Sequence, residues 1–224
     1  MVKKYFIFLG LLCFLLVGLW ACSSQNIPHP SGTQSQSRSK TTAKGIDPKV
    51  LNIARKAQHK VRKSGVSIKE PLVIIDYSLP SSQKRLWIID AQDNVLFHTY
   101  VAHGRGSGND RATHFSDLPG STQTSIGVFV TGKPYYGRHG RSLALHGLEA
   151  GYNAHAYQRR IVIHSADYVS PDVVRRMGRL GRSWGCPALE KNVINPIIDL
   201  IQDGAVILAY YPDNQWLKKS QYIS

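Results

Sequence analysis

The sequence predicts a mainly β domain with marginal helices, an α+β fold. Short runs rich in Val, Ile, Tyr and Phe recur between residues 72 and 211, and Gly, Pro, Asn or Asp bound them, which is the pattern of β-strands. Only three segments show helical periodicity, one before this region and two near its end. Long glycine-rich loops interrupt the strands, and loops of this kind on a β scaffold often carry binding and catalytic residues.

The N-terminus has the order of residues that is typical of a bacterial lipoprotein signal peptide. Two lysines precede an apolar run over residues 5–20, and the small residue Ala21 stands directly before Cys22. A transmembrane helix is the alternative, but it needs roughly 20 apolar residues, and polar sequence follows this shorter run at once. Cleavage would remove residues 1–21 and leave Cys22 as the site of lipidation and of membrane anchoring.

The residues after the anchor predict a tether followed by one domain. Residues 22–45 consist mainly of Ser, Thr, Gln, Pro and Gly, so they cannot bury enough apolar surface to fold. About 180 residues follow, which suffice for one domain with a real core. Ser23 and not an aspartate follows the lipidated cysteine, so we expect an outer-membrane position facing the periplasm if the organism has two membranes.

Residues 46–70 predict an N-terminal helix that packs on the domain. Asp47 is a suitable N-cap, Pro48 suits the first helical position, and Gly65 ends the helix. The apolar face of this helix consists of Val50, Leu51, Ala54, Ala57 and Val61.

The domain itself is expected over residues 71–212, with a C-terminal tail over 213–224. The expected strands cover residues 72–77, 85–90, 95–101, 125–131, 142–145, 160–164 and 205–211. The two later helices are expected over residues 171–177 and 192–202, where Gly204 follows the second helix.

The chain is strongly basic, with a formal net charge of +14, and loss of Lys3 and Lys4 with the signal peptide would leave +12. Nucleic acid is the usual partner of such a charge, but an exported protein meets little of it. Polyanionic material of the cell envelope, such as peptide stems with free carboxylates, is therefore the expected partner. A basic surface that serves only solubility is the alternative, and nothing in the sequence indicates an oligomeric state.

In the folded region one cysteine, Cys186, has no structural role assigned to it. Removal of residues 1–21 takes Cys13 away and lipidation uses Cys22, so Cys186 has no disulfide partner. His164 ends an apolar strand and can act as its general base, while Arg179 and Arg182 can supply a positive field that lowers the pKa of the thiol.

An oxyanion next to this thiol would need N–H donors, and Gly185 lets its backbone amide approach closely. An inert buried cysteine is the alternative for Cys186 alone. Together with a strand-end histidine, however, it favours nucleophilic cysteine chemistry. The nine histidines show no spacing typical of a zinc site, and no metal or nucleotide cofactor is expected.

The motif Ser183-x-Gly185-Cys186, preceded by a strand-end histidine, resembles the nucleophile loop of the murein L,D-transpeptidase family. The resemblance covers about residues 72–211, and it is to the less studied branch of that family. It implies a β-sandwich-like catalytic domain with a cysteine nucleophile. Further motifs that carry it are His103-Gly104-x-Gly106-Ser107-Gly108, Leu145-His146-Gly147-Leu148-Glu149, Arg160-Ile161-Val162-Ile163-His164 and Gly181-Arg182-Ser183-Trp184-Gly185-Cys186-Pro187-Ala188.

The resemblance also implies a reaction. Cys186 would attack the carbonyl that joins the diamino acid of a peptidoglycan stem tetrapeptide to its terminal D-alanine, release D-alanine and form a thioester. An amine of a second stem, a lysine of an envelope protein, or water would then accept the acyl group; with water the enzyme would be an L,D-carboxypeptidase. A lipoprotein that binds peptidoglycan without catalysis is the non-enzymatic alternative.

The sequence departs from the commoner branch around the nucleophile. Trp184 stands where that branch has histidine, and Pro187 and Ala188 follow the cysteine in place of an arginine or asparagine. The contact with the substrate carboxylate is therefore expected from Arg182 or Arg179. Substrate binding as a whole is expected from Arg182, Ser183, His146 and Arg179. His146 is also the alternative general base.

Overall fold

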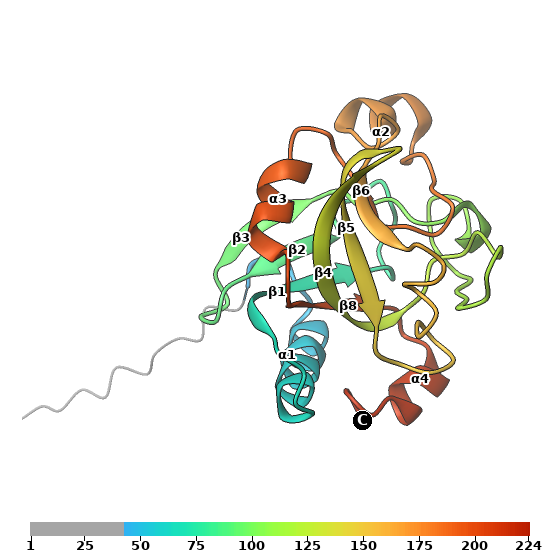
Figure 1. Cartoon of the computed structure of the whole chain (residues 1–224). Coiled ribbons are helices and arrows are strands. Elements are labelled where there is room, and N and C mark those ends of the chain that lie inside the picture. The colour runs from blue at the N-terminus through green and yellow to red at the C-terminus, as the bar shows by residue number, and fades with distance from the viewer. Residues whose placement is uncertain (1–42) are drawn as a thin grey trace, which may run out of the picture. The chain divides into compact units, whose positions relative to one another are not determined.

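The computed structural model of the protein describes residues 43–224 (Figure 1). The predicted signal peptide, the lipidation site Cys22 and most of the predicted tether lie outside the described residues. None of the helices between residues 43 and 224 has the length and the apolar character that a membrane span requires.

One mixed sheet of eight strands organises the described chain, so the mainly β prediction is confirmed. The strand order is β3-β2-β1-β8-β4-β5-β6-β7, in which β1 with β8 and β6 with β7 are the parallel pairs. The strands are β1 (Lys69–Asp76), β2 (Leu86–Ile89), β3 (Val95–Thr99), β4 (Gly127–Gly137), β5 (Gly140–Gly147), β6 (Val162–Ser165), β7 (Ala188–Leu189) and β8 (Ala205–Tyr210).

The two edges of this sheet are joined by the chain that leaves β3. The backbone N–H of Ala102 donates to the carbonyl of Ala188 in β7 at 2.9 Å, and the hydroxyl of Thr99 donates to the Glu190 carboxylate at 3.0 Å. The sheet therefore curls into a nearly closed form, as Figure 1 shows, and the sandwich-like packing arises within one sheet. This closure brings the loop after β3 against the segment that precedes β7.

The strands are apolar on both faces because both faces are covered. Along β1, Val73 and Ile75 belong to a core cluster that includes helix α3 (Ile194–Ile201), whereas Leu72 and Ile74 belong to a second cluster that includes helix α1 (Pro48–Lys63). Successive side chains of a strand point to opposite faces, so β1 contributes to both clusters.

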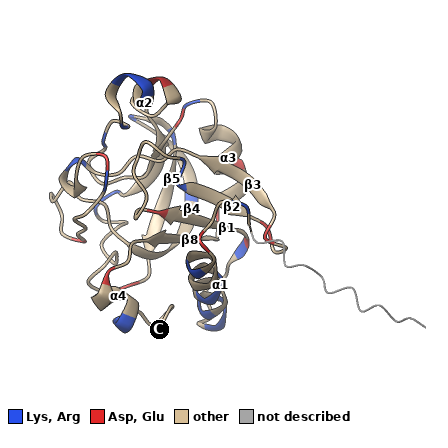
Figure 2. Ribbon diagram, turned by 180° about the vertical axis from the view of Figure 1, so that it is seen from behind, with Lys and Arg blue, Asp and Glu red and all other residues tan. Residues whose placement is uncertain are grey.

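The predicted helices are confirmed together with their ends. The carboxylate of Asp47 accepts a hydrogen bond from the N–H of Lys49 at 2.7 Å and caps α1. Helix α2 (Pro171–Met177) is capped by Ser170 and ends at Gly178 in the left-handed conformation. The solvent side of α1 carries many basic residues, seen as blue segments in Figure 2, and α1 and α2 lie at opposite ends of the molecule in both views (Figures 1 and 2).

The β4–β5 hairpin is longer than the sequence indicates. Strand β4 continues through Pro134 to Gly137, whereas a strand was expected only to residue 131. Proline and glycine in this stretch are typical of a turn, but the pairing shifts register between Thr131 and Pro134, which accommodates the missing N–H of proline. The extension places the hairpin tip beside the site described below.

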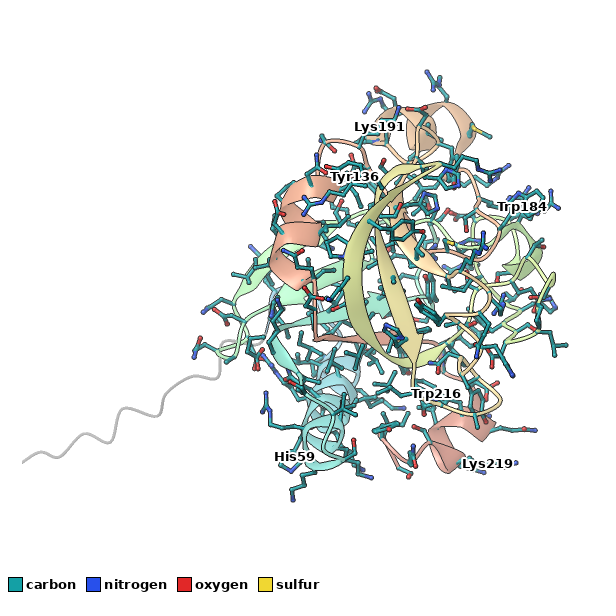
Figure 3. The ribbon with its side chains drawn as sticks, viewed as in Figure 1. His59, Tyr136, Trp184, Lys191, Trp216 and Lys219 are labelled. Atoms are coloured by element: carbon teal, nitrogen blue, oxygen red, sulfur yellow. The ribbon has the colours of Figure 1, made fainter. Side chains whose placement is uncertain are left out.

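The segment expected as a C-terminal tail packs into the second core cluster. Helix α4 (Asn214–Lys219) carries Trp216, whose side chain is fully buried (Figure 3). Its indole N–H donates to the carboxylate of Glu149 at 3.1 Å, and the same carboxylate accepts the N–H of Val128 at 2.6 Å and the hydroxyl of Ser220. Burial raises the pKa of Glu149, and these three donors oppose the rise. Glu149 therefore joins the C-terminus to β4.

We predict that Trp216→Ala destabilises the domain by about 3–5 kcal/mol, because it removes a fully buried indole and leaves an unpaired lone pair on Glu149. Trp184→Ala, which removes an indole that is 71% exposed, is the matched control and should change the free energy of unfolding by no more than about 0.5 kcal/mol. Urea unfolding of both variants measures the difference. Equal midpoints for the two variants would contradict the proposed packing of α4.

Candidate active site

Cys186 and His164 face one cavity at the edge of the sheet. Parallel pairing sets His164 of β6 beside Ala188 of β7, so Cys186, two residues earlier, lies beside Val162. A strand rises about 3.3 Å per residue, so His164 and Cys186 are offset by roughly 7 Å along the strands. The cavity of about 640 Å³, named here the Cys186 cavity, is lined by Tyr135, Gly137, Arg138, His139, Arg159, Arg160, Ile161, Val162, His164, Tyr168, Arg182, Ser183, Trp184 and Cys186.

His164 is held in one tautomer by a backbone carbonyl. Its Nδ1 lies 2.9 Å from the carbonyl oxygen of Ser165, which can only accept, so Nδ1 carries the proton and Nε2 carries the lone pair. Burial lowers the pKa of His164, the bond to Ser165 opposes this shift, and the charge of His139 lowers the pKa further. The two imidazoles are stacked, with ring centroids 4.4 Å apart. His164 is thus prepared to accept a proton at Nε2.

The environment of Cys186 favours the neutral thiol, which corrects the expectation of a lowered pKa. Burial raises the pKa of Cys186 more than the N–H of Val162, the guanidinium of Arg159 and the N–H of Cys186 itself lower it. The thiol donates to the carbonyl of Arg160, at a sulfur-to-oxygen distance of 3.6 Å. Within residues 43–224, no imidazole is hydrogen-bonded to this sulfur. Both pKa shifts therefore favour a neutral thiol and a neutral imidazole.

Arg159 is the cation whose charge lowers the pKa of Cys186, and it was not predicted from the sequence. Its side chain is 4% exposed, and its guanidinium donates to the carbonyls of Ser116 at 2.6 Å and Gln123 at 2.8 Å and to the hydroxyl of Ser125 at 2.6 Å. Asp117 lies 4.0 Å away. Nothing in the local sequence distinguishes Arg159 from its neighbour Arg160, because its partners come from a loop more than 30 residues earlier.

The two arginines that were expected to lower the pKa of the thiol form their hydrogen bonds with other groups. Arg182 lines the Cys186 cavity, but its guanidinium donates to the carbonyl of Gly108 at 3.1 Å and to the side chain of Asn109 at 3.0 Å. Arg179 does not line this cavity, and its guanidinium donates to the carbonyl of Leu180 at 2.8 Å. The structure therefore brings Arg182 to the site and leaves Arg179 outside it.

Ser183 forms two hydrogen bonds within the loop that carries Cys186. Its hydroxyl donates to the carbonyl of Cys186 at 2.6 Å and accepts the N–H of Gly185 at 3.1 Å. The N–H of Gly185 was expected to donate to an oxyanion, but here it donates to Ser183 within the loop. The amides turned toward the sulfur are those of Cys186 and Val162, and Val162 had not been assigned such a role.

Contact between Gly104 and Gly185 holds this loop against the glycine-rich loop over residues 103–108. A Cβ atom on Gly104 would lie 2.3 Å from the carbonyl oxygen of Thr122 and 2.8 Å from Cα of Gly185, so only glycine fits there. Gly185 itself has φ +127°, a conformation that L side chains rarely adopt. The hydroxyl of Thr124 donates to the carbonyl of Gly185 at 3.0 Å and accepts the N–H of Gly104 at 2.8 Å.

The remaining residues of the glycine-rich loop divide into buried and exposed ones. His103 and Ser107 are fully buried. Nδ1 of His103 accepts a hydrogen bond from Arg85 at 2.7 Å, and burial together with the charge of Arg85 lowers the pKa of His103 to about 4. These two residues form hydrogen bonds within the protein and have no exposed surface. Arg105 is exposed, and its guanidinium lies over the ring of Trp184, 4.5 Å from the centroid.

His146, the alternative base, belongs to a neighbouring cavity. This cavity, named here the His146 cavity, has a volume of about 900 Å³. The imidazole of His146 stacks on Tyr157 with a centroid distance of 4.8 Å. His146 does not line the Cys186 cavity, whereas His164 does. The two cavities share Tyr135, Arg160, Ile161 and Val162.

Comparisons with known proteins identify a family. Residues 42–210 match the family described as the L,D-transpeptidase catalytic domain. The chain is similar to the solved carbamoyl enzyme of Ldtfm with avibactam (15% identity, TM-score 0.38, covering 65% of this chain and 51% of that one) and to an L,D-transpeptidase from Mycobacterium smegmatis (14% identity, TM-score 0.39, covering 62% and 58%). It thus spans little more than half the length of either structure. No curated protein matches the sequence.

We predict that Gly104→Ala displaces the nucleophile loop and lowers the rate at which iodoacetamide alkylates Cys186 by at least about tenfold, because its Cβ overlaps Cα of Gly185. Gly65→Ala is the control. Gly65 has φ +83° with no atom within 4 Å of the added Cβ, so this variant carries backbone strain far from the loop. A Gly104→Ala protein with the wild-type alkylation rate would contradict the contact between the loops.

We predict that His139→Gln raises the pKa of His164, because it removes the nearby charge that opposes protonation. Any activity that needs neutral His164 is lost as the pH falls through this pKa, so the acidic limb of the pH profile should move to higher pH. NMR titration of the imidazole signals measures the shift. His59→Gln, on exposed α1 at the far end of the molecule, should leave the titration of His164 unchanged (Figure 3).

Proposed function

Because the chain belongs to the L,D-transpeptidase catalytic domain family, we propose that it is a peptidoglycan-modifying enzyme whose nucleophile is Cys186 and whose general base is His164. One observation carries the assignment of the site. The only cysteine among the described residues and a histidine with a free Nε2 lie on adjoining segments and open into the same cavity.

The chemistry starts from a neutral pair. As Sγ of Cys186 attacks the carbonyl between the diamino acid and D-alanine, Nε2 of His164 takes the thiol proton. The offset between the two residues requires closer approach in the substrate complex, and catalytic hydrogen bonds often tighten only there. His164 then returns the proton to the nitrogen of the departing D-alanine, which leaves a thioester on Cys186.

The second half of the reaction regenerates the thiol. An acceptor amine attacks the thioester carbonyl, His164 takes a proton from the attacking nitrogen, and the proton passes to the sulfur as the C–S bond breaks. The amides of Cys186 and Val162 point toward the sulfur and are the proposed donors to the oxyanion in both steps. Water as acceptor would give L,D-carboxypeptidase activity at the same site.

The charge of the Cys186 cavity supports an anionic peptide as substrate. Four arginines line it, namely Arg138, Arg159, Arg160 and Arg182, and its lining contains no aspartate or glutamate. Arg159 is held by four hydrogen bonds within the protein, so Arg138, Arg160 and Arg182 are the proposed partners of the stem carboxylates. Ser183 supports binding indirectly, by fixing the loop that carries Trp184 and Cys186.

The proposed location of the enzyme rests on the N-terminal sequence. We propose that cleavage before Cys22 and lipidation of this cysteine attach the domain to a membrane of the cell envelope, with the residues between Cys22 and Ala43 as a tether. Ala43 itself is buried in the second core cluster, so the predicted tether ends before it. The tether would allow the Cys186 cavity to reach stems at a distance from the membrane.

We predict that incubation with a disaccharide tetrapeptide adds the acyl part of the substrate to Cys186 and releases D-alanine, and mass spectrometry of protein and products measures both. Cys186→Ala should show neither change. His164→Gln should lower kcat by about 10²–10⁴, the usual contribution of a general base. The products identify the acceptor, because a 3-3 cross-linked dimer requires a second stem and a tripeptide requires water.

His146→Gln is the matched histidine control, because His146 lies in the neighbouring cavity. A larger loss of kcat in this variant than in His164→Gln would reassign the base. Intact substrate and unmodified Cys186 in the wild-type protein would refute the enzyme and leave a lipoprotein that binds peptidoglycan.

A further inference from the structure

An exposed tryptophan stands directly beside the nucleophile. Trp184 is 71% exposed, although Ser183 and Gly185 on either side of it are buried. Burying an indole is strongly favourable, so a large exposed aromatic ring at a site commonly marks a contact with a ligand. Figure 3 shows Trp184 at the periphery of the molecule, on the side away from the buried Trp216.

The backbone keeps this indole outside the core. The N–H of Ser183 donates to the carbonyl of His103 at 2.9 Å, and the carbonyl of Ser183 accepts the N–H of Arg105 at 2.8 Å. The loop is therefore fixed on both sides of Ser183, and Trp184 cannot turn inward without breaking these bonds. The guanidinium of Arg105 covers one face of the ring at 4.5 Å from the centroid and orients it.

The indole of Trp184 lines a third cavity. It has a volume of about 410 Å³, and we name it the Trp184 cavity; it is lined by Arg105, Pro119, Gly120, Thr122, Arg159, Ile161 and Trp184. Arg159, Ile161 and Trp184 also line the Cys186 cavity, so the two cavities are neighbours. Flat apolar surfaces from Trp184 and Pro119 stand beside hydrogen-bonding groups from Arg105 and Thr122, and the lining contains no carboxylate.

This combination suits a pyranose ring. The C–H face of a sugar packs on an aromatic ring, while its hydroxyl and N-acetyl groups form hydrogen bonds at the rim. A peptide side chain or an acyl chain would use the apolar surface but not the polar rim around it. The absence of acidic residues from this lining is also compatible with the lactyl and carboxyl groups of an envelope saccharide.

We propose that the Trp184 cavity binds the N-acetylated amino sugar that carries the stem peptide. The proposal rests on the proposed function, since it names the part of the substrate that lies next to the reacting peptide. Three stem residues separate the sugar from the scissile carbonyl and span at most about 11 Å when extended. Cα of Trp184 lies within about 7 Å of Cα of Cys186, since only Gly185 stands between them. The sugar and the scissile bond can therefore occupy their cavities together.

The first test compares two donors, a disaccharide tetrapeptide and the bare tetrapeptide, with the full chain in detergent. For the wild-type protein we expect a higher kcat/KM with the disaccharide tetrapeptide. Trp184→Ala should reduce this preference by about tenfold, which corresponds to about 1.4 kcal/mol of sugar binding, and Trp184→Phe should restore part of it. Tyr136→Ala, which removes another exposed aromatic ring that does not line the Trp184 cavity, should keep the preference.

The second test does not need catalysis. We expect a chitin tetrasaccharide to change the tryptophan fluorescence of Cys186→Ala protein, and the change should disappear when Trp184→Phe is added. Among the described tryptophans Trp87 and Trp216 are buried, so the signal reports on Trp184. Acylation of Cys186 with equal preference for both donors and no saccharide binding would overturn the glycan site alone. Saccharide binding without acylation by any stem peptide would overturn the proposed catalysis and leave the glycan site standing.

Discussion

The contact between Gly104 and Gly185 is the constraint on which the site depends. Gly104 follows the edge strand β3, and Gly185 precedes the opposite edge strand β7, so their contact lies where the curled sheet brings its two edges together. A side chain on Gly104 would overlap the backbone of Gly185, and one on Gly185 would meet the carbonyl of Gln123 and the side chain of Ile161. Through this contact the glycine-rich loop determines where the sulfur of Cys186 and the indole of Trp184 are placed.

Electrostatics and burial act against each other at the sulfur. Burial favours the neutral thiol and the neutral imidazole, while Arg159 and two backbone amides favour the thiolate. Burial is the larger effect at both groups, so it favours the neutral thiol and the neutral imidazole. The surrounding arginines then have a second role, since they lie in the same cavity and can neutralise an anionic substrate. The basic composition of the chain and the absence of acidic residues from this cavity are consistent with each other.

Local signals predicted the regular elements well and the irregular ones poorly. The proline and the caps at Asp47 and Ser170 mark α1 and α2, because helix ends are stabilised by neighbours in sequence. Strand β7 has two residues and is a strand only because β6 lies beside it. The same holds for α4, whose position depends on the distant carboxylate of Glu149. Elements stabilised by partners far away in the chain leave little pattern in their own residues.

The sequence by itself determined the candidate reactive groups: a cysteine in a glycine-containing loop, a histidine at a strand end and a basic composition. These properties depend only on the type of each residue and on its neighbours in the sequence, so they are present before the chain folds. Only the tertiary structure decided which groups meet. It placed His164 and Cys186 in one cavity and His146 in the next, and it brought Arg159 and not Arg179 into the surroundings of the thiol. Cavity walls and electrostatic fields arise from segments that are distant in sequence and become neighbours when the sheet closes, so no local pattern encodes them.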